Sequence, residues 1–261
     1  WWSEHAEIFA MADTFRLDFE DAVVDPGTLF VTGLGGSHVG SGTGRKRGVV
    51  GLAAISDGNG VRADVRDSPL YVEATAGSRL FLRPVTASGP IRLLGFARPI
   101  TFGAIVEAEV DLGERDARRV AEFRFPLSWH NYGAPVRYEI RYRLVPENEA
   151  PITRQLDDAT VLVTMPCANG RSTVWFDLET PARLLRDGDD ATLSDIEWGV
   201  EARGGAPARM GVRRLRLWTK RSDATRTGAR CLVALRDADA AKCIAAIDDL
   251  PSGRAAMSDE I

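Results

Sequence analysis

The chain has 261 residues, of which 44% are hydrophobic and 27% are charged, and its formal net charge is −4. This composition excludes a disordered chain and indicates a globular protein with a sizeable core. The negative charge disfavours nucleic acid and anionic membranes as partners. No apolar run is long enough to span a bilayer, so we expect a soluble protein without membrane contact. A secreted or periplasmic location is favoured over a cytoplasmic one.

The amino-terminal half consists of short predicted strands. Residues 1–13 are predicted to form an arm or short helix, and the alternation of Phe15, Leu17 and Phe19 predicts the first strand. Residues 33–48 are rich in glycine and end in basic residues, but they lack the spacing of a phosphate-binding loop and precede a strand. We expect a surface loop there, with a flap that contacts an anionic ligand as the alternative. Further strands are expected at residues 49–55, 61–65, 70–75, 79–85 and 91–97.

Turn residues separate these strands every eight to twelve positions, which is typical of an all-β sandwich or barrel. Alternating long helices are missing from the pattern, so a doubly wound α/β fold is not expected. The sequence therefore predicts an all-β, antiparallel, two-sheet jelly-roll sandwich with a short N-terminal arm and a C-terminal helix.

Residues 101–144 carry the clearest pattern in the chain. Three segments in this stretch alternate with a period of two, as half-buried antiparallel strands do. The apolar faces hold Val106, Val110, Phe123, Phe125, Leu127, Trp129, Tyr138, Ile140 and Tyr142. Residues 131–135 have the composition of a turn, so the second and third segments are predicted to pair as a hairpin whose polar faces form one patch.

The carboxyl-terminal half adds four predicted strands, at residues 160–166, 172–179, 195–203 and 212–220. A helix is predicted from about Asp237 to Leu250, where Pro251 and Gly253 follow. We expect a β-sandwich domain over residues 1–221 and a strand and helix extension over 222–261 that packs on it. Three cysteines do not make a disulfide framework. Cys167 is expected to be reduced, and pairing of Cys231 with Cys243 stays open.

The strand number, the central EAEVD segment and the closing EWGVEARGGAPARMGVRRLRLW together resemble a jelly-roll β-sandwich. They are similar to the concanavalin-like and galactose-binding-like groups over roughly residues 14–220. This resemblance implies a glycan-binding module, a glycan hydrolase or a polysaccharide lyase, with the ligand on the concave sheet. It concerns the fold and does not assign a function by itself.

Three groups of residues are candidates for chemistry. The first is Glu107-x-Glu109-x-Asp111, which resembles the acidic triplet that laminarinase-type retaining glycosidases place on one strand face. That family pattern has Glu at both ends, whereas Asp111 is last here. Solvated acidic residues opposite an arginine-rich strand are the alternative interpretation.

The second group combines a possible base with cations. Abstraction of a proton beside a uronate carboxylate needs a base, such as His130 or Tyr132, and groups that stabilise the developing charge. The binding role is assigned to residues of the same hairpin: Arg124, Asn131, Arg137, Glu139 and Arg141. The alternative is a cross-strand ladder of Arg and Glu that only stabilises the sheet.

The third group is aromatic, because sugar rings stack on exposed aromatic faces. Most of the aromatic residues fall on apolar faces, so Tyr132 and Trp175 are the exposed candidates. The three histidines are scattered and no cysteines have ligand spacing, so neither a metal site nor a cofactor is predicted.

These observations favour a carbohydrate-active enzyme, a lyase or a hydrolase, that acts on an acidic polysaccharide on the concave sheet. His130, Tyr132, Glu107 and Glu109 are its predicted catalytic residues. Two alternatives stay open: a non-catalytic glycan-binding module, and an enzyme for a small polar or polyketide-like substrate held inside the sandwich.

Overall fold

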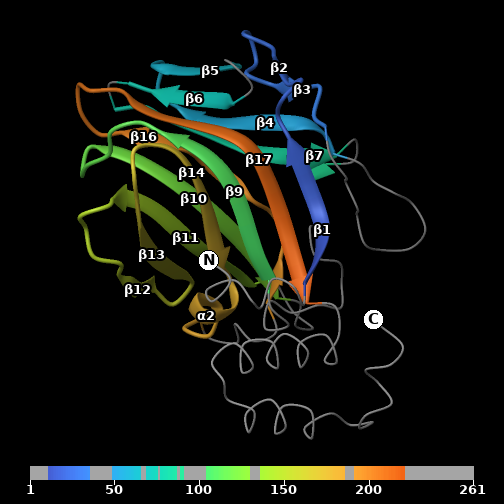
Figure 1. Cartoon of the computed structure of the whole chain (residues 1–261), viewed down its shortest axis with the longest axis vertical. Helices are drawn as coiled ribbons and strands as arrows, with labels where there is room; N and C mark the ends of the chain where they lie inside the picture. The colour runs from blue at the N-terminus through green and yellow to red at the C-terminus, as the bar shows by residue number, and fades with distance from the viewer. Residues whose placement is uncertain are drawn as a thin grey trace, which may run out of the picture. The chain divides into compact units, whose positions relative to one another are not determined.

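A computed structural model describes residues 11–35, 49–65, 69–75, 77–86, 89–90, 104–129, 136–185 and 191–220. Residues 14–217 form one compact unit, built almost entirely from strands. The strands form two sheets, and Figure 1 shows the layer of β14, β9, β17 and β1 in front of the layer that contains β10, β11 and β13. The predicted all-β sandwich is therefore confirmed.

Among the described residues, the first sheet has six strands in the order β14-β9-β17-β6-β5, with β1 also paired to β17. Its strands are β1 (Met11–Asp18), β5 (Val61–Val65), β6 (Leu70–Ala74), β9 (Ala104–Leu112), β14 (Gly170–Asp177) and β17 (Ala208–Lys220). Strand β9 lies between β14 and β17, so segments far apart in the sequence meet in the middle of this sheet.

The second sheet has eleven strands within the described part of the chain, ordered β12-β13-β11-β10-β16-β7-β4-β3-β2, with β15 paired to β10 and β8 to β7. Its strands are β2 (Val23–Val24), β3 (Val31–Thr32), β4 (Val49–Asp57), β7 (Arg79–Thr86), β8 (Gly89–Pro90), β10 (Arg119–Trp129), β11 (Val136–Pro146), β12 (Thr153–Asp157), β13 (Thr160–Cys167), β15 (Thr192–Leu193) and β16 (Glu197–Ala202). The predicted hairpin is present: β10 and β11 pair antiparallel, with Arg124 opposite Arg141.

The sheets are not antiparallel throughout. Strands β11 and β13 run parallel, because the chain leaves β11, forms β12 at the sheet edge and returns as β13 between the two. The edge strand β12 is exposed along its whole length and was not predicted. A short helix, α2 (Glu179–Ala182), follows β14, where the Asp177 carboxylate accepts a hydrogen bond from the backbone N–H of Glu179 at 2.9 Å.

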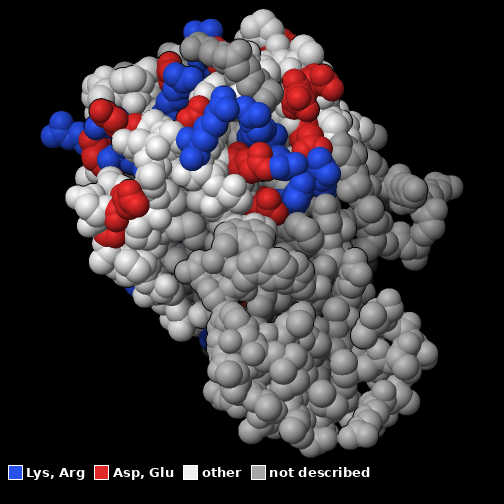
Figure 2. All heavy atoms as spheres, in the orientation of Figure 1, with Lys and Arg blue, Asp and Glu red and all other residues white. Residues whose placement is uncertain are grey.

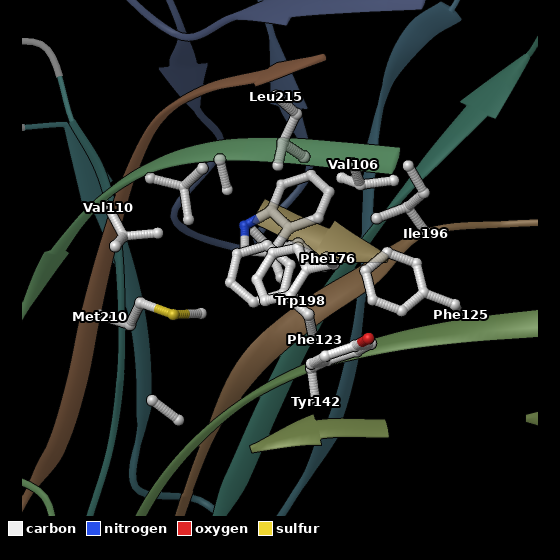
Figure 3. Close-up of a cluster of buried hydrophobic side chains, with 14 of the residues drawn as sticks. Val106, Val110, Phe123, Phe125, Tyr142, Phe176, Ile196, Trp198, Met210 and Leu215 are labelled. Atoms are coloured by element: carbon white, nitrogen blue, oxygen red, sulfur yellow. The ribbon is translucent and has the colours of Figure 1, made fainter. Parts of the chain in front are cut away.

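The inner faces of both sheets form the core. Phe123 and Phe125 of β10 are fully buried and contact Phe176 of β14, with ring centroids 4.7 and 5.5 Å apart (Figure 3). Tyr142 packs against the same ring at 5.0 Å, and Trp198 packs against Phe19 at 5.5 Å. The predicted inward face of β10 is confirmed for Phe123, Phe125 and Leu127.

The outer faces of the two sheets point in opposite directions, because their inner faces pack on each other. On β9 the burial alternates, so Val106, Ala108 and Val110 face the core while Glu109 and Asp111 face outward. On β10 the outward residues include Glu122 and Arg124. The acidic triplet and the arginine-rich hairpin therefore lie on opposite sides of the sandwich.

Several expectations fall partly or wholly outside the described residues. These are the arm over residues 1–10, most of the glycine-rich loop, the strand at 91–97, the C-terminal helix and extension, and the Cys231 and Cys243 pair. Within the described region, residues 11–13 already belong to β1, and Cys167 is a buried free cysteine, as predicted. No helix in the described part of the chain is long and apolar enough to cross a membrane.

Candidate functional site

The outer face of the six-stranded sheet carries the acidic triplet on β9, next to the edge strand β14. Each glutamate of the triplet has an arginine of the neighbouring strand β17 as partner. Glu109 forms an ion pair with Arg214, and the Glu107 carboxylate lies 3.8 Å from Nη1 of Arg216. Glu107 is buried, whereas Glu109 is partly exposed. The alternation that placed these acids on one face is thus confirmed, and their partners come from the end of the chain.

Asp111, the third acid, is held by a tyrosine from the other side of β17. The hydroxyl group of Tyr71 on β6 donates a hydrogen bond to Oδ2 of Asp111. To reach it, the Tyr71 ring crosses Gly211, where a Cβ atom would lie 2.6 Å from the ring. The guanidinium of Arg209 lies over the same ring, 3.9 Å from its centroid. Burial, followed by the bond to Asp111, raises the pKa of Tyr71, so its hydroxyl stays protonated and donates.

A pocket of about 230 Å³ opens beside these residues. Its outward side chains come from three strands and one loop residue: Glu109 and Asp111 (β9), Arg171 and Thr173 (β14), Arg213 (β17) and Pro69. The register places Arg171 opposite Asp111, and Thr173 opposite Glu109. Figure 2 shows this face, with arginine and acidic side chains intermixed over the region where β9 and β17 lie in Figure 1.

Trp175 extends the same face along β14. It lies two residues beyond Thr173, is partly exposed and stands opposite Glu107 in the register. An aromatic side chain thus neighbours a pocket lined by hydrogen-bonding groups. Sequence analysis identified Glu107, Glu109 and Trp175 but missed Tyr71, Arg171, Thr173 and Arg213. The one available signal was that Thr173 and Trp175 share a strand face.

The outer face of the eleven-stranded sheet holds the other predicted residues. There Glu122, only 2% exposed, accepts hydrogen bonds from Nε of Arg124 at 2.9 Å and from Nη2 of Arg143 at 3.2 Å. Glu139 accepts a hydrogen bond from Nε of Arg141. The guanidinium of Arg124 also lies over the Phe81 ring, 3.7 Å from its centroid. These contacts match the alternative interpretation of this face, a cross-strand ladder of Arg and Glu.

The end of the hairpin is described only in part. Arg137 is exposed and stands opposite Ser128. His130, Asn131 and Tyr132 lie outside the described residues, so their predicted roles stay predictions. What the structure shows is that Arg124, Glu139 and Arg141 share one face, as predicted, and that Glu107, Glu109 and Trp175 do not belong to it.

Two further carboxyl groups, Asp195 just before β16 and Glu197 at its first position, were not predicted as site residues. Asp195 is 6% exposed, and burial raises its pKa to about 7. Burial also raises the pKa of Glu197. The positive charge of Arg124 acts to lower this pKa, and the negative charge of Glu139 acts to raise it. Burial in a fold is a long-range property, so the segment DIEWGVEA gives no local sign of these shifts. In the described part of the chain, no group of three or more His, Cys, Asp or Glu side chains is arranged to hold a metal ion.

Comparison with known proteins gives likenesses of fold. No protein-family model matches the chain, and no curated protein does. The solved structures that resemble it include endoglucanase 3 of family GH12 from Trichoderma harzianum, with 12% identity and a TM-score of 0.35 over 64% of this chain and 93% of that one. Endoglucanase cel12A from Rhodothermus marinus shares 12% identity with a TM-score of 0.39, over 78% of this chain and 99% of that one.

A family 29 carbohydrate-binding module from Piromyces equi is also similar, with 9% identity and a TM-score of 0.28 over 63% of this chain and 79% of that one. These likenesses, with identities of 12% or less and TM-scores of 0.39 or less, assign no family to the chain and no role to any of its residues.

Proposed function

We propose that the chain binds a glycan on the outer face of the six-stranded sheet. The observation that carries this proposal is the pocket between β14, β9 and β17, where carboxylate, guanidinium and hydroxyl groups converge. Sugar hydroxyl groups both donate and accept hydrogen bonds, so they need carboxylate acceptors, guanidinium donors and a group such as the Thr173 hydroxyl that does both.

The geometry of the acids favours recognition over cleavage on this face. In a retaining glycosidase, one of two carboxyl groups must give a proton to the leaving oxygen. Here Glu107 and Glu109 each contact an arginine. These contacts fix the orientation of the two carboxylates, as expected for groups that accept hydrogen bonds from a ligand. Side chains fixed in advance bind a ligand at a smaller entropic cost, so a glycan-binding module is the first interpretation.

Trp175 supports the same interpretation, because the apolar face of a sugar ring stacks on an exposed aromatic ring.

The packing of the core also favours a ligand site on an outer face of the sandwich. Between the described strands, large side chains such as Phe123, Phe176 and Trp198 fill the interior. This packing favours a ligand on the surface of the sandwich over a small substrate held inside it.

The test is a glycan panel followed by calorimetry on two variants and a matched control. Trp175→Ala removes the stacking surface, and Thr173→Val removes one hydroxyl group with little change of shape. Each is expected to weaken binding of the best glycan. Thr153→Val, at an exposed threonine of β12 in the other sheet, is expected to leave affinity unchanged. Failure of the wild type to bind any glycan, or equal binding by all four proteins, would contradict the proposal.

Lyase-type action on an acidic polysaccharide is a second candidate, located at the end of the β10–β11 hairpin. It is supported by Arg137, which is exposed and for which no ion pair is seen among the described residues. The connection from β10 to β11 contains His130 and Tyr132, the predicted proton-transferring residues. Release of unsaturated product by the wild type, and its loss in His130→Ala with folding intact, would support this candidate. A wild type that releases no such product from any acidic glycan would contradict it.

A further inference from the structure

The charged side chains around the pocket on the six-stranded sheet differ in whether they have a partner. Both acids that line it already have partners: Glu109 forms an ion pair with Arg214, and Asp111 accepts the hydrogen bond from Tyr71. Tyr71 is neutral, so its bond to Asp111 uses no cation. Two guanidinium groups, those of Arg171 and Arg213, line the same pocket, and Arg213 already has an interaction within the structure.

Arg171 differs from the other arginines of this face. Arg214 and Arg216 contact the glutamates of β9, and Arg209 lies over the Tyr71 ring. Arg171 is exposed, and the structure shows no hydrogen bond or ion pair between it and any other described residue, although it stands opposite Asp111. It lies on β14, at the edge of the sheet, where an incoming ligand reaches its guanidinium from solvent.

We propose that this pocket selects glycans that carry an anionic group, a carboxylate or a sulfate ester, and that Arg171 binds this group. The inference rests on the proposed glycan-binding function and specifies its ligand class. A guanidinium binds a carboxylate or sulfate through two parallel N–H donors, which gives orientation as well as attraction. Arg213 adds positive potential to the same pocket, while Glu109 and Asp111 accept hydrogen bonds from neutral hydroxyl groups.

The experiment compares three oligosaccharides of the same length and linkage: one neutral, one with uronate residues and one with sulfate esters. The wild type is expected to bind at least one of the anionic ligands about tenfold or more tightly than the neutral one, because hydrogen bonds to charged groups are among the stronger ones. This preference is expected to shrink as ionic strength rises, since the pocket is open to solvent.

Arg171→Gln is expected to lose the preference, and so to bind the anionic and neutral ligands alike. Arg171→Lys keeps the charge but not the paired donors, so an intermediate affinity is expected. Arg154→Gln is the matched control, because Arg154 is an exposed strand arginine on the other sheet. Urea midpoints equal to that of the wild type would show that the variants are folded.

The outcomes separate the two proposals. If the wild type binds the neutral ligand as tightly as the anionic ones and Arg171→Gln behaves like it, the anionic inference is overturned while glycan binding stands. If the wild type binds no glycan of the three or of the wider panel, both fail. If uronate but not sulfate depends on Arg171, or the reverse, the inference is supported and the anionic group is identified.

Discussion

Replacement of Glu122 by Ala tests whether the arginine-rich face of the eleven-stranded sheet is structural. This carboxylate is 2% exposed and accepts hydrogen bonds from Arg124 at 2.9 Å and from Arg143 at 3.2 Å. Its removal leaves two guanidinium groups without their shared acceptor. Breaking a buried ion pair by removing one partner costs about 3–5 kcal/mol. Because the Arg143 side chain is 28% exposed and regains water, we expect about 3 kcal/mol.

The measurement is the free energy of unfolding in urea, with the slope m compared between variants. Glu122→Gln keeps the shape but removes the charge, and it is expected to fall between wild type and Glu122→Ala. Glu149→Ala, at an exposed residue of the loop after β11, is the control and is expected to change stability by less than about 0.5 kcal/mol. A loss below about 1 kcal/mol in Glu122→Ala would refute the structural interpretation and restore the case for an anionic ligand on this face.

Two further predictions concern the core and the response to pH. Phe125→Ala should lower the free energy of unfolding by about 3–5 kcal/mol, because the ring is fully buried and packs on Phe176 and Tyr142; an unchanged urea midpoint would show that the inward face of β10 is assigned wrongly. Burial raises the pKa of Asp195 from about 3.8 to about 7, so the folded state binds its proton more tightly than the unfolded state does. The contribution of protonated Asp195 to the free energy of unfolding is fully present below about pH 4. It is lost as the pH rises through about 7. Asp195→Asn, which cannot ionise, should therefore match the wild type near pH 4 and exceed it at pH 8 by up to about 4 kcal/mol in urea unfolding, from about 1.4 kcal/mol per pKa unit; equal pH profiles would contradict the assignment.

Burial on the three central strands was predictable because it depends on a local property. Alternation with a period of two assigns side chains to faces without knowledge of the neighbours. For β9, β10 and β11 the apolar set faces the core as expected, including Val106, Phe125 and Ile140. Strand β12 was missed for the same reason: all five of its residues are exposed, so the sequence there has no alternation to detect.

The pairing of strands was less predictable, because it depends on contacts between distant segments. The parallel pairing of β11 with β13 arises from the path of the chain through β12 and has no local signature. In the same way, alternation put Glu107 and Arg124 on polar faces but did not show that these faces belong to different sheets. The pocket combines Asp111 of β9, Arg171 of β14 and Arg213 of β17, whose proximity only the sheet order provides.

The two outer faces use the same residue types for different purposes, and burial separates them. On the eleven-stranded sheet, Glu122 is enclosed and its arginine partners use their donors within the sheet. On the six-stranded sheet, the partners of Glu109 and Asp111 fix these acids beside an open pocket, and Arg171 remains exposed there. A dense group of arginines in the sequence is therefore weak evidence for an anionic ligand. A guanidinium that lines a pocket, next to acids whose partners are already in place, is stronger evidence, because such a group has donors to offer a ligand.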